Sequence, residues 1–383
     1  MEQENEKKPL DLTEIRDQID EVDHVIVNGF QKRMELVHSV AEYKIANKIP
    51  VLDPKRESDK IAELSGLAHS RFNQRGIRDI FMQMMSISRK MQYRMLSDAG
   101  VFQKYHFERV EEIRRKDVRV VFQGVPGAYA HEATLQYFGE DCDHYHVPTW
   151  KAVMEEVAEG KADYGVLPIE NSSAGAVSDV YDLLMSYNNV IVAETYLRVA
   201  HVLAALPGAK LEEIRTVYSH AQGLMQCSDF LEAYDMNRVA LSNTAIAAKT
   251  VAESGDLTVA AICSEKAAKL QGLTVLKKPV NNNRTNTTRF IIISGKPIFA
   301  MDAERVSICF EAHHEPGALY RLLSHIIYNS LNMTGIESRP IPEKNWEYRF
   351  FVDFEGNLDD PGVLSALHGI EAESSVMKIL GNY

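Results

Sequence analysis

The stretch Asp163-Tyr-Gly-Val-Leu-Pro-Ile-Glu-Asn-Ser-Ser-Ala-Gly175 decides how the middle of the chain folds. The apolar run at residues 165–169 predicts a short buried strand, and residues 177–185 predict a helix. The small polar residues between them bring hydroxyls, amides and backbone N–H groups to one point. Such a junction holds anions at the carboxyl edge of an α/β sheet. An ordinary loop with a Ser/Asn helix cap is the alternative.

Similar polar clusters follow other predicted strands, at residues 219–222, 242–244 and 281–289. Strands are predicted at residues 119–122, 144–147, 165–169, 190–193, 199–205, 216–218, 239–241, 259–262 and 290–293. Helices are predicted to begin near Thr149, Ala221, Ala245 and Glu265. This alternation indicates an α/β domain with a largely parallel sheet, and the repeated polar junctions indicate a lined cleft. Because the sequence has neither a GxGxxG motif nor a P-loop, nucleotide binding is not predicted.

Length and composition limit the class of protein. The 383 residues carry a formal net charge of −12, which argues against general nucleic-acid binding. The four cysteines are far apart and form no CxxC pair, so neither disulfides nor a metal site is predicted. No apolar run approaches the length of a membrane span, and no cofactor is predicted. We therefore expect a cytoplasmic protein of two or three domains.

The first hundred residues predict an all-α module of three helices. No proline interrupts residues 11–46, where Leu12, Ile19 and Ile26 recur on one face, and this predicts a helix of about 50 Å. Further helices are predicted from about residue 54 to 68 and from about residue 76 to 97. A helix as long as the first cannot bury its apolar stripe against one short chain, so bundle packing or dimerisation is implied.

Polar side chains interrupt this apolar stripe. Arg33 lies seven residues after Ile26 and so continues the series of the apolar stripe. Lys44 lies about three helical turns after Arg33 and projects from nearly the same face. On the third predicted helix, Ser88 and Gln92 are neighbours at positions i and i+4. Buried cations are costly unless an anion is bound, so the stripe predicts an anion site. Basic side chains that reach solvent at the edge of a bundle are the alternative.

In order and nearly in spacing, a set of polar residues resembles the active site of the all-helical chorismate mutases: Arg16, Arg33, Lys44, Asp53, Arg56, Glu57, Ser88 and Gln92. In that family three helices per chain intertwine into a dimer, and each site takes one arginine from the partner's long helix. The resemblance implies this role for Arg16. It also implies that Arg33 and Arg56 are the main clamps for the substrate carboxylates.

The chemistry of chorismate suits these side chains. Chorismate rearranges to prephenate in one pericyclic step, without proton transfer or a covalent intermediate. Catalysis therefore means holding the compact conformer and stabilising the negative charge that develops on the ether oxygen. The resemblance implies that Lys44 and Gln92 donate to that oxygen and that Glu57 accepts from the ring hydroxyl.

The middle of the chain resembles prephenate dehydratase through the motifs Gly165-Val-Leu-Pro-Ile-Glu-Asn-Ser172, Ser219-His-Ala-Gln222 and Thr288-Arg-Phe290. In that family two α/β subdomains, built like a periplasmic binding protein, enclose prephenate, which loses carbon dioxide and hydroxide to form phenylpyruvate. In that family the threonine at the position of Thr288 protonates the leaving hydroxyl or donates a hydrogen bond to it. An alcohol is a poor general acid at neutral pH, so Glu170 is the alternative acid. Candidate substrate-binding or supporting residues are Asn171, Ser172, Ser219, Gln226 and Arg289.

The last eighty residues predict the order βαββαβ, which indicates an α+β ferredoxin-like sandwich. The strands are expected at residues 305–310, 334–339, 348–354 and 376–380, and the helices at 317–330 and 362–367. Two motifs resemble the ligand motifs of ACT regulatory domains, where phenylalanine binds at a dimer interface. Their candidate allosteric residues are Gly317, Ala318, Leu319, Glu337, Ser338 and Arg339. The family usually has a small aliphatic residue at the position of Tyr320, which leaves the identity of the ligand open.

Together these resemblances cover nearly the whole chain and are those of the bifunctional P-proteins, the chorismate mutase/prephenate dehydratases of phenylalanine biosynthesis. They imply a mutase domain at residues 8–98, a dehydratase domain at 118–296 and an ACT domain at 303–383. Between the first two, the charged stretch at residues 108–117 predicts a helical linker at 99–117, with a last helix of the first module as the alternative. The resemblances also imply a homodimer or higher homo-oligomer that takes chorismate and prephenate as substrates and phenylalanine as allosteric inhibitor. A helical module that serves only in dimerisation, and a small-molecule sensor without turnover, are the alternatives.

Overall fold

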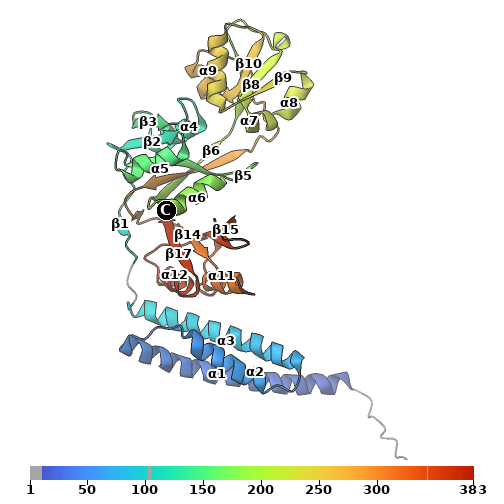
Figure 1. Cartoon of the computed structure of the whole chain (residues 1–383), viewed down its shortest axis with the longest axis vertical. Helices are drawn as coiled ribbons and strands as arrows, with labels where there is room; N and C mark the ends of the chain where they lie inside the picture. Colours follow the sequence, from blue (N-terminus) through green and yellow to red (C-terminus); the bar gives the residue numbers. More distant parts are fainter. Residues whose placement is uncertain (1–10, 102–104, 343) are drawn as a thin grey trace, which may run out of the picture. The chain divides into compact units, whose positions relative to one another are not determined.

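The computed structural model describes residues 11–101, 105–342 and 344–383, which form two compact units built from separated parts of the chain. The first unit combines the N-terminal helices with two helices from the C-terminal part (Figure 1). The second unit contains the described strands and the remaining helices. The predicted start of the mutase domain at residue 8 lies outside the described residues.

The helices of the first unit are α1 (Leu12–Asn47), α2 (Pro54–Gly66), α3 (Arg71–Asp98), α11 (Ala318–Tyr328) and α12 (Pro361–Glu373). The three predicted N-terminal helices are confirmed, although α3 begins earlier than expected. Its start is fixed by Ser70, whose side chain accepts a hydrogen bond from the backbone N–H of Asn73. Asp53 caps α2 in the same way, and Pro54 occupies the first helical position.

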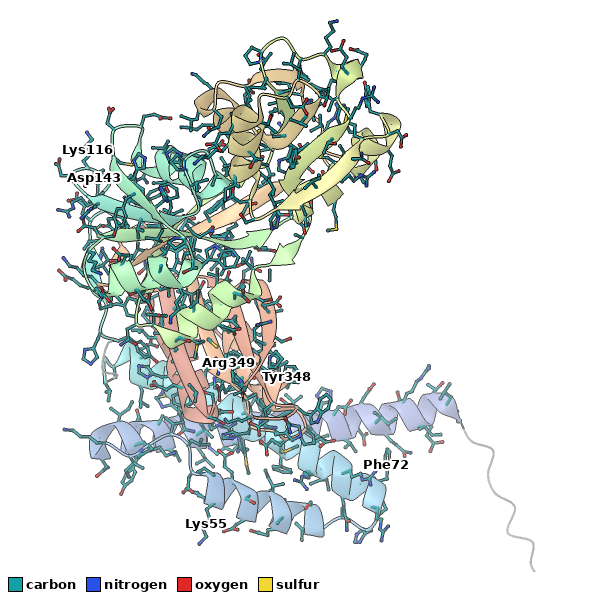
Figure 2. The ribbon with its side chains drawn as sticks, turned by 45° about the horizontal axis from the view of Figure 1, so that its top comes forward. Lys55, Phe72, Lys116, Asp143, Tyr348 and Arg349 are labelled. Carbon is teal, nitrogen blue, oxygen red and sulfur yellow. The ribbon has the colours of Figure 1, made fainter. Side chains whose placement is uncertain are left out.

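The apolar stripe of α1 is largely uncovered within the single chain. Leu12, Val25 and Leu36 are 60%, 71% and 59% exposed, and Ala41 is the buried residue of this helix. Figure 2 shows Lys55 of α2 and Phe72 of α3 at the surface of the same unit. The three N-terminal helices by themselves therefore enclose little core.

The larger sheet of the second unit has the strand order β15-β16-β14-β17-β6-β12-β4-β2-β3, with β5 beside β4. Its strands are β2 (Arg119–Gln123), β3 (Asp143–Val147), β4 (Tyr164–Asn171), β5 (Gly175–Ala176), β6 (Val190–Arg198), β12 (Thr287–Ser294), β14 (Arg305–Glu311), β15 (Met333–Pro340), β16 (Tyr348–Glu355) and β17 (Val376–Asn382). The strands of the dehydratase-like region and of the C-terminal region are thus joined in one sheet.

The smaller sheet has the order β11-β7-β10-β8-β9. It contains β7 (His201–Ala205), β8 (Thr216–His220), β9 (Asn237–Leu241), β10 (Val259–Ser264) and β11 (Thr274–Lys277). The helices of the second unit are α4 (Tyr129–Phe138), α5 (Trp150–Ala158), α6 (Ser178–Ser186), α7 (Ala221–Met225), α8 (Ser228–Ala233), α9 (Thr244–Ser254) and α10 (Glu265–Leu270), with a 3₁₀ turn at Leu211–Glu213. The two sheets and their helices form two α/β subdomains.

The prediction of a largely parallel sheet is wrong. Parallel pairs do join β2 to β3 and β4, and β8 to β9 and β10. However, β12 runs antiparallel to both β4 and β6, and β7 runs antiparallel to β10 and β11. The chain passes almost directly from β6 into β7 and comes back to the larger sheet through β12. Strands that leave and re-enter a sheet in this way have no helical crossover to make them parallel.

The helical linker predicted at residues 99–117 is also wrong for the residues described. Strand β1 (Glu108–Val110) lies in this stretch and pairs in parallel with β13 (Ile298–Ala300). Ile113, only 7% exposed, packs in a core cluster with Val118 and Phe138. Burial of these apolar side chains and the pairing of β1 thus override the charged pattern that predicted a helix.

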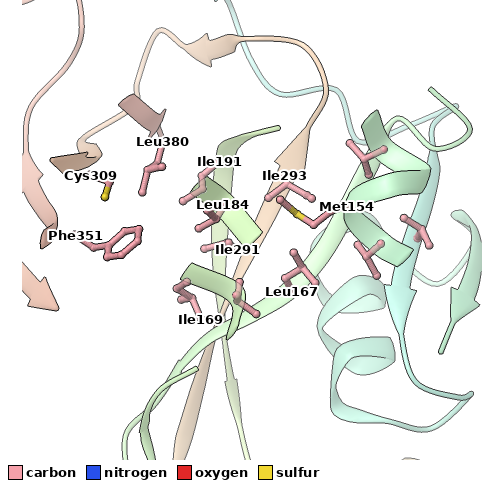
Figure 3. Close-up of a cluster of buried hydrophobic side chains, with 14 of the residues drawn as sticks. Met154, Leu167, Ile169, Leu184, Ile191, Ile291, Ile293, Cys309, Phe351 and Leu380 are labelled. Atoms are coloured by element: carbon pink, nitrogen blue, oxygen red, sulfur yellow. The ribbon is translucent and has the colours of Figure 1, made fainter. Parts of the chain in front are cut away.

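Apolar residues cover both faces of the larger sheet. On one face, Ile291 and Ile293 of β12 pack in a cluster with Cys309, Phe351 and Leu380 of the C-terminal strands (Figure 3). On the other face, Phe290 and Ile292 pack in a second cluster with Phe122 and Ala133. The alternation of these residues along β12 assigns each of its side chains to one face.

A glycine lets the C-terminal strands join the sheet. Gly381 of β17 pairs with Ile191 of β6, and a Cβ atom at Gly381 would lie only 2.1 Å from the carbonyl oxygen of Ile191. Any other residue would push the two strands apart at this point. Among the described residues, no helix has both the length and the apolar content needed to cross a bilayer.

Candidate active sites

Arg33 is fixed between the helices of the first unit. Its Nη1 atom donates to the Oγ atom of Ser88 and, at 3.3 Å, to the carbonyl oxygen of Met84. Ser88 in turn donates to the Met84 carbonyl at 2.6 Å. These bonds hold the guanidinium of Arg33 on α1 against α3, where the resemblance to chorismate mutases expects a carboxylate clamp.

Lys44 lies near the end of α1 and donates from Nζ to the carbonyl oxygen of Val51 at 2.6 Å. Partial burial, followed by the nearby charge of Arg56, lowers the pKa of Lys44. Burial also lowers the pKa of Arg33, against the opposing charge of Glu57. Cations that are desolvated and close to one another attract an anionic ligand. The structure thus brings Arg33, Lys44, Arg56 and Glu57 into one electrostatic environment.

The amide of Gln92 is buried close to Ser88. Its Nε2 atom donates to the Ser88 carbonyl oxygen at 3.1 Å, while its Oε1 atom is buried and has no hydrogen-bond partner among the described residues. Leaving a buried polar atom unsatisfied is unfavourable, so this amide is suited to a polar ligand. Asp53 accepts from the backbone N–H of Arg56 at 3.1 Å and caps α2, and its negative charge acts on Lys44.

Glu57 belongs to an ion-pair chain that the sequence did not predict. Arg89, which is 5% exposed, forms an ion pair with Glu57 through Nη1 and with Glu373 of α12 through Nε at 2.8 Å. The Oε1 atom of Glu373 also lies 3.0 Å from Nε2 of His325 on α11. Burial would raise the pKa of Glu373, but the hydrogen bond from His325 and the charge of Arg89 outweigh burial and lower it to about 2. These ion pairs and hydrogen bonds therefore connect Glu57, a candidate mutase residue, to α11 and α12.

Arg16 does not join this group of side chains. It lies on an exposed part of α1, 17 residues before Arg33. At 1.5 Å per residue, this separation is roughly 25 Å along the helix. Arg16 therefore cannot reach a ligand beside Arg33 of the same chain.

The second candidate site is a cavity of about 880 Å³ in the second unit, lined by residues of both α/β subdomains. Thr288 and Asn171 line it from the larger sheet, and His201 and Gln226 line it from the smaller subdomain. Such a volume between two α/β layers accommodates a small organic ligand. The lined cleft predicted from the polar junctions is present.

Asn171 fixes the hydroxyl of Thr288. Its Nδ2 atom donates to Oγ1 of Thr288 at 2.9 Å and to Oδ1 of Asn286 at 2.8 Å, and its Oδ1 atom accepts from the backbone of Ser173 and Ala174 at 3.0 Å. Because Oγ1 already accepts a hydrogen bond from Asn171, the hydroxyl proton of Thr288 is left to donate to another group. The Thr288 side chain lines the cavity, so that group can be a ligand.

Several helices begin at the wall of this cavity. The first residue of α4, Tyr129, lines it, and so do Thr149 and Asn243, the N-caps of α5 and α9. No side chain caps the N-terminus of α4. Helix N-termini attract anions through their free N–H groups and the helix dipole. Lys151, near the start of α5, adds a cationic side chain to the lining.

His201 is a lining residue that sequence reasoning missed. Its Nδ1 atom lies 2.9 Å from the hydroxyl of Tyr129, and its Nε2 atom lies 3.1 Å from Oε1 of Gln226. Burial lowers the pKa of His201 to about 4, so the ring is neutral, with the proton on Nε2 and the Tyr129 hydroxyl donating to Nδ1. A single histidine at the start of an apolar strand carries no local signal that distinguishes it from an ordinary core residue.

Four predicted residues of the dehydratase site lie outside this cavity. Ser219 is fully buried and donates to the carbonyl oxygen of Ile262, so it links β8 to β10 and does not reach the ligand. Ser172 accepts from the backbone N–H of Thr287 at 3.0 Å and holds the end of β4 to β12. Glu170 and Arg289 line a different cavity, of about 480 Å³. For Ser172, Ser219 and Arg289 this geometry favours the supporting role over substrate binding, because their side chains are already bonded to protein groups.

The two predicted allosteric motifs lie in different units. Gly317 is the N-cap of α11 with a φ of 78°, and Ala318 behind it is buried. Glu337, Ser338 and Arg339 lie on β15, where Arg339 binds Oδ2 of Asp182 at 2.7 Å. Asp182 lines the large cavity, so this motif contacts the wall of the second candidate site.

Comparison with known proteins finds two families in this chain. The chorismate mutase type II family matches residues 15–93, and the prephenate dehydratase family matches residues 120–298. A bifunctional chorismate mutase/prephenate dehydratase from Escherichia coli K12 is 32% identical over 380 residues, covering 97% of this chain and 96% of its own. An arogenate dehydratase/prephenate dehydratase from Arabidopsis thaliana is 36% identical over 282 residues, covering 70% of this chain and 72% of its own.

A solved structure supports the same assignment. The prephenate dehydratase from Arthrobacter aurescens, determined in complex with L-Phe, is 29% identical, has a TM-score of 0.65, and is matched over 70% of this chain and 90% of its own. The E. coli relative matches 97% of this chain in one polypeptide, in agreement with the two family matches. The chain therefore belongs to the bifunctional chorismate mutase/prephenate dehydratases, enzymes of phenylalanine biosynthesis.

Proposed function

We propose that Thr288, and not Glu170, acts on the leaving hydroxyl of prephenate. The observation that carries this proposal is the 2.9 Å hydrogen bond from Asn171 Nδ2 to Thr288 Oγ1 at the wall of the cleft. The bond directs the hydroxyl proton away from Asn171 and stabilises negative charge on Oγ1 as the proton is shared. Glu170 lines the smaller cavity and lies 3.9 Å from Arg289, so it does not face the substrate.

The reaction then needs few groups. As the bond between the ring and its carboxylate breaks, the electron pair enters the ring and carbon dioxide leaves. The hydroxyl departs as water once it has taken a proton, for which Thr288 is the donor or relay. The first turns of α4, α5 and α9, together with Lys151, hold the carboxylates of prephenate. Gln226 is placed to orient substrate from the other subdomain through its contact with His201.

For the mutase reaction, Lys44 and Gln92 donate to the ether oxygen of chorismate, while Arg33 and Arg56 bind its carboxylates. In support, Arg33 and Lys44 are partly desolvated cations that share the charge of Glu57, and the Nε2 atom of Gln92, which donates one N–H to Ser88, keeps a second N–H for a ligand. Glu57 accepts from the ring hydroxyl. Ser88 positions Arg33 through its hydroxyl.

The mutase site requires a second chain. Arg16 is too far along α1 to reach the site of its own chain, and the apolar side chains of α1 are largely exposed. A homodimer in which the long helices of two chains pack together would cover this stripe and bring Arg16 to the partner's site. We retain the predicted division into domains at residues 8–98, 118–296 and 303–383 as part of this proposal.

The C-terminal region is an ACT domain that binds phenylalanine and lowers the activity of the enzyme. Its elements follow the order βαββαβ from β14 to β17, and the Arthrobacter aurescens relative was solved with L-Phe. The inhibitor must prefer a conformation of low activity, since equal affinity for both conformations would have no effect. Tyr320, which is 53% exposed, stands where the family usually has a small aliphatic residue. Phenylalanine analogues of different size therefore test which ligand this domain binds.

One assay tests these activities together. Purified protein is given chorismate and then prephenate, and both substrate loss and phenylpyruvate formation are followed with and without phenylalanine. Phenylpyruvate from both substrates, reduced by phenylalanine, is the expected result. Product from prephenate alone would mean that the helices only dimerise, and binding without turnover would mean a sensor.

The role of Thr288 is tested by a matched pair of variants. Thr288→Ser keeps the hydroxyl, and Thr288→Val keeps the shape without it. We expect the serine variant to retain dehydratase activity and the valine variant to lose about 100-fold or more in kcat. Glu170→Gln should retain activity; a larger loss in Glu170→Gln than in Thr288→Val would reverse the assignment.

A further inference from the structure

Arg289 follows Thr288 directly but lies on the opposite face of β12. Thr288, Phe290 and Ile292 alternate with Arg289, Ile291 and Ile293 along the strand. Phe290 lines the substrate cleft together with Thr288, whereas Ile291 and Ile293 belong to the core that contains Phe351 and Leu380 (Figure 3). Arg289 is therefore the polar member of the row that faces the C-terminal strands.

The guanidinium of Arg289 already donates to protein groups from each of its three nitrogen atoms. Its Nε atom binds Oε2 of Glu194 at 2.6 Å, its Nη1 atom binds Oδ2 of Asp353 at 2.9 Å, and its Nη2 atom donates to the hydroxyl of Tyr383 at 2.7 Å. The residue is only 8% exposed. A substrate carboxylate would have to displace two carboxylates from a buried site, which is unfavourable.

The groups that hold Arg289 are themselves fixed. Ser307 of β14 donates to Oδ1 of Asp353 at 2.5 Å and lies 2.7 Å from the hydroxyl of Tyr383. Asp353 is on β16, and Tyr383 directly follows β17. Glu194 is on β6. One buried network thus connects the strand that carries Thr288 to the neighbouring β6 and to the C-terminal strands.

Other contacts make the same connection rigid. Cys309, Phe351 and Leu380 share a core with residues of β4, β6 and β12. Lys378 of β17 donates to the carbonyl oxygens of Leu184 and Tyr187 at the end of α6, at 2.7 and 2.5 Å. Within this apolar core, the Arg289 network supplies directional bonds, which resist sliding of one strand past another.

We propose that Arg289 is a positioning residue for the dehydratase reaction, which anchors β12, and with it Thr288, to Asp353 and Tyr383 of the C-terminal region. The inference rests on Thr288 being the group that acts on the leaving hydroxyl. Its consequence is that the C-terminal strands form part of the support of the dehydratase site. A ligand that displaces β16 or β17 would then act on Thr288 through Arg289.

The residues that never touch substrate provide the test. Asp353→Asn and Arg289→Gln both break the Arg289–Asp353 ion pair, the first by removing the carboxylate and the second by removing the guanidinium. A misplaced catalytic group lowers the rate much more than it weakens substrate binding, by about 100-fold for a displacement near 1 Å. We expect both variants to lose about 100-fold in dehydratase kcat, with KM for prephenate little changed. Tyr383→Phe, which removes one bond, should show a smaller loss of the same kind.

Arg305→Gln is the matched control. Arg305 lies 3.4 Å from Glu194 and 3.9 Å from Asp353, so it shares both carboxylates with Arg289, but it is on β14 and not beside Thr288. This variant should keep dehydratase kcat within a few-fold of the wild type. Mutase activity of the same preparations reports on the first unit, and urea unfolding shows whether the second unit is folded. If Asp353→Asn does not fold, Tyr383→Phe still breaks one bond of the anchor.

The possible outcomes separate the two assignments. A raised KM in Arg289→Gln with both constants normal in Asp353→Asn and Tyr383→Phe would make Arg289 a substrate ligand and overturn the inference. A loss of kcat in Thr288→Val without a loss in Asp353→Asn or Tyr383→Phe would also overturn it, and would leave the role of Thr288 intact. Normal kcat in Thr288→Val would instead remove the proposed function of Thr288.

Discussion

Ser88 and Thr288, one in each candidate site, are each followed directly by a buried arginine, but only one of the two arginines faces its site. Arg89 follows Ser88 on a helix and forms an ion pair with Glu57 itself. Arg289 follows Thr288 on a strand and faces the other side of the sheet. Successive residues are about 100° apart on a helix but about 180° apart on a strand. The same sequence pattern therefore places a charge beside one site and a support behind the other.

Both arginines also bind a carboxylate of the C-terminal part. Arg89 binds Glu373 of α12 in the first unit, and Arg289 binds Asp353 of β16 in the second. The Arg89–Glu373 pair changes the charge around Glu57, whereas the Arg289–Asp353 pair holds the position of β12. A change in the C-terminal residues should accordingly affect the two reactions by different physical routes.

The largest expected effect tests whether the two sites are separate. In the proposed mechanism Lys44→Ala removes a donor to the ether oxygen, and loss of one such donor costs about 100- to 1000-fold in kcat. Mutase activity should fall by that amount while dehydratase activity with prephenate stays normal. Lys32→Ala, on the exposed side of the same helix, should leave both activities unchanged. Equal loss of both activities in Lys44→Ala would contradict separate sites.

Glu373→Gln tests whether the Arg89–Glu373 pair acts on the mutase site through the charge around Glu57. Removing one partner of a buried ion pair costs about 3–5 kcal/mol of folding stability, and Glu373 and Arg89 are 8% and 6% exposed. The variant should lose stability in urea unfolding and lose mutase activity, because Arg89 then pairs with Glu57 alone. Dehydratase kcat should not change. Glu371→Gln, at a carboxylate that is 54% exposed on the same helix, should cost at most about 1 kcal/mol.

The pH dependence of the same pair has a defined sign. The folded-state pKa of Glu373 is about 2, below its ordinary value of 4.5. Its contribution is therefore fully present above about pH 4.5 and is lost as the pH falls toward 2. Unfolding free energies of the wild type and Glu373→Gln should converge in that window. Divergence toward low pH would contradict the assignment of the ion pair.

His201 provides a corresponding test in the dehydratase cleft. Its pKa is about 4 in the folded state and 6.5 ordinarily, so the unfolded chain binds the proton more readily between these values. Stability should therefore fall by about 3 kcal/mol as the pH drops from 6.5 to 4. The slope in this window should be smaller in His201→Asn. An unchanged slope would mean that His201 is not held neutral by burial.

The smallest expected effect concerns Arg339. Its partner Asp182 lines the substrate cavity, and both side chains are partly exposed, at 25% and 42%. Arg339→Ala should therefore cost little stability but leave an uncompensated negative charge near a dianionic substrate. We expect KM for prephenate to rise about two- to fivefold, the range of a partly exposed ion pair. Adding Asp182→Asn should reverse the rise, and failure to do so would exclude this charge effect.

Much of the fold follows from local patterns. Apolar periodicity and capping residues placed the N-terminal helices, and the polar junctions after the strands predicted a lined cleft, because helix caps and strand ends are encoded by neighbouring residues. The family motifs identified Thr288, Asn171 and Gln226, which line that cleft. The period of two along β12 also contained the information that Arg289 faces away from Thr288.

Long-range packing decided the rest. No local pattern could show that Asp353 and Tyr383 would meet Arg289, that Glu373 would reach Arg89, or that His201 would line the cleft. Ser219 carried the polar signature of a binding junction, yet it lies inside the sheet and binds Ile262. The direction of each side chain can be inferred from the periodicity of its own element. The group that it meets depends on which distant strand or helix packs against that face, and this is a property of the folded chain as a whole.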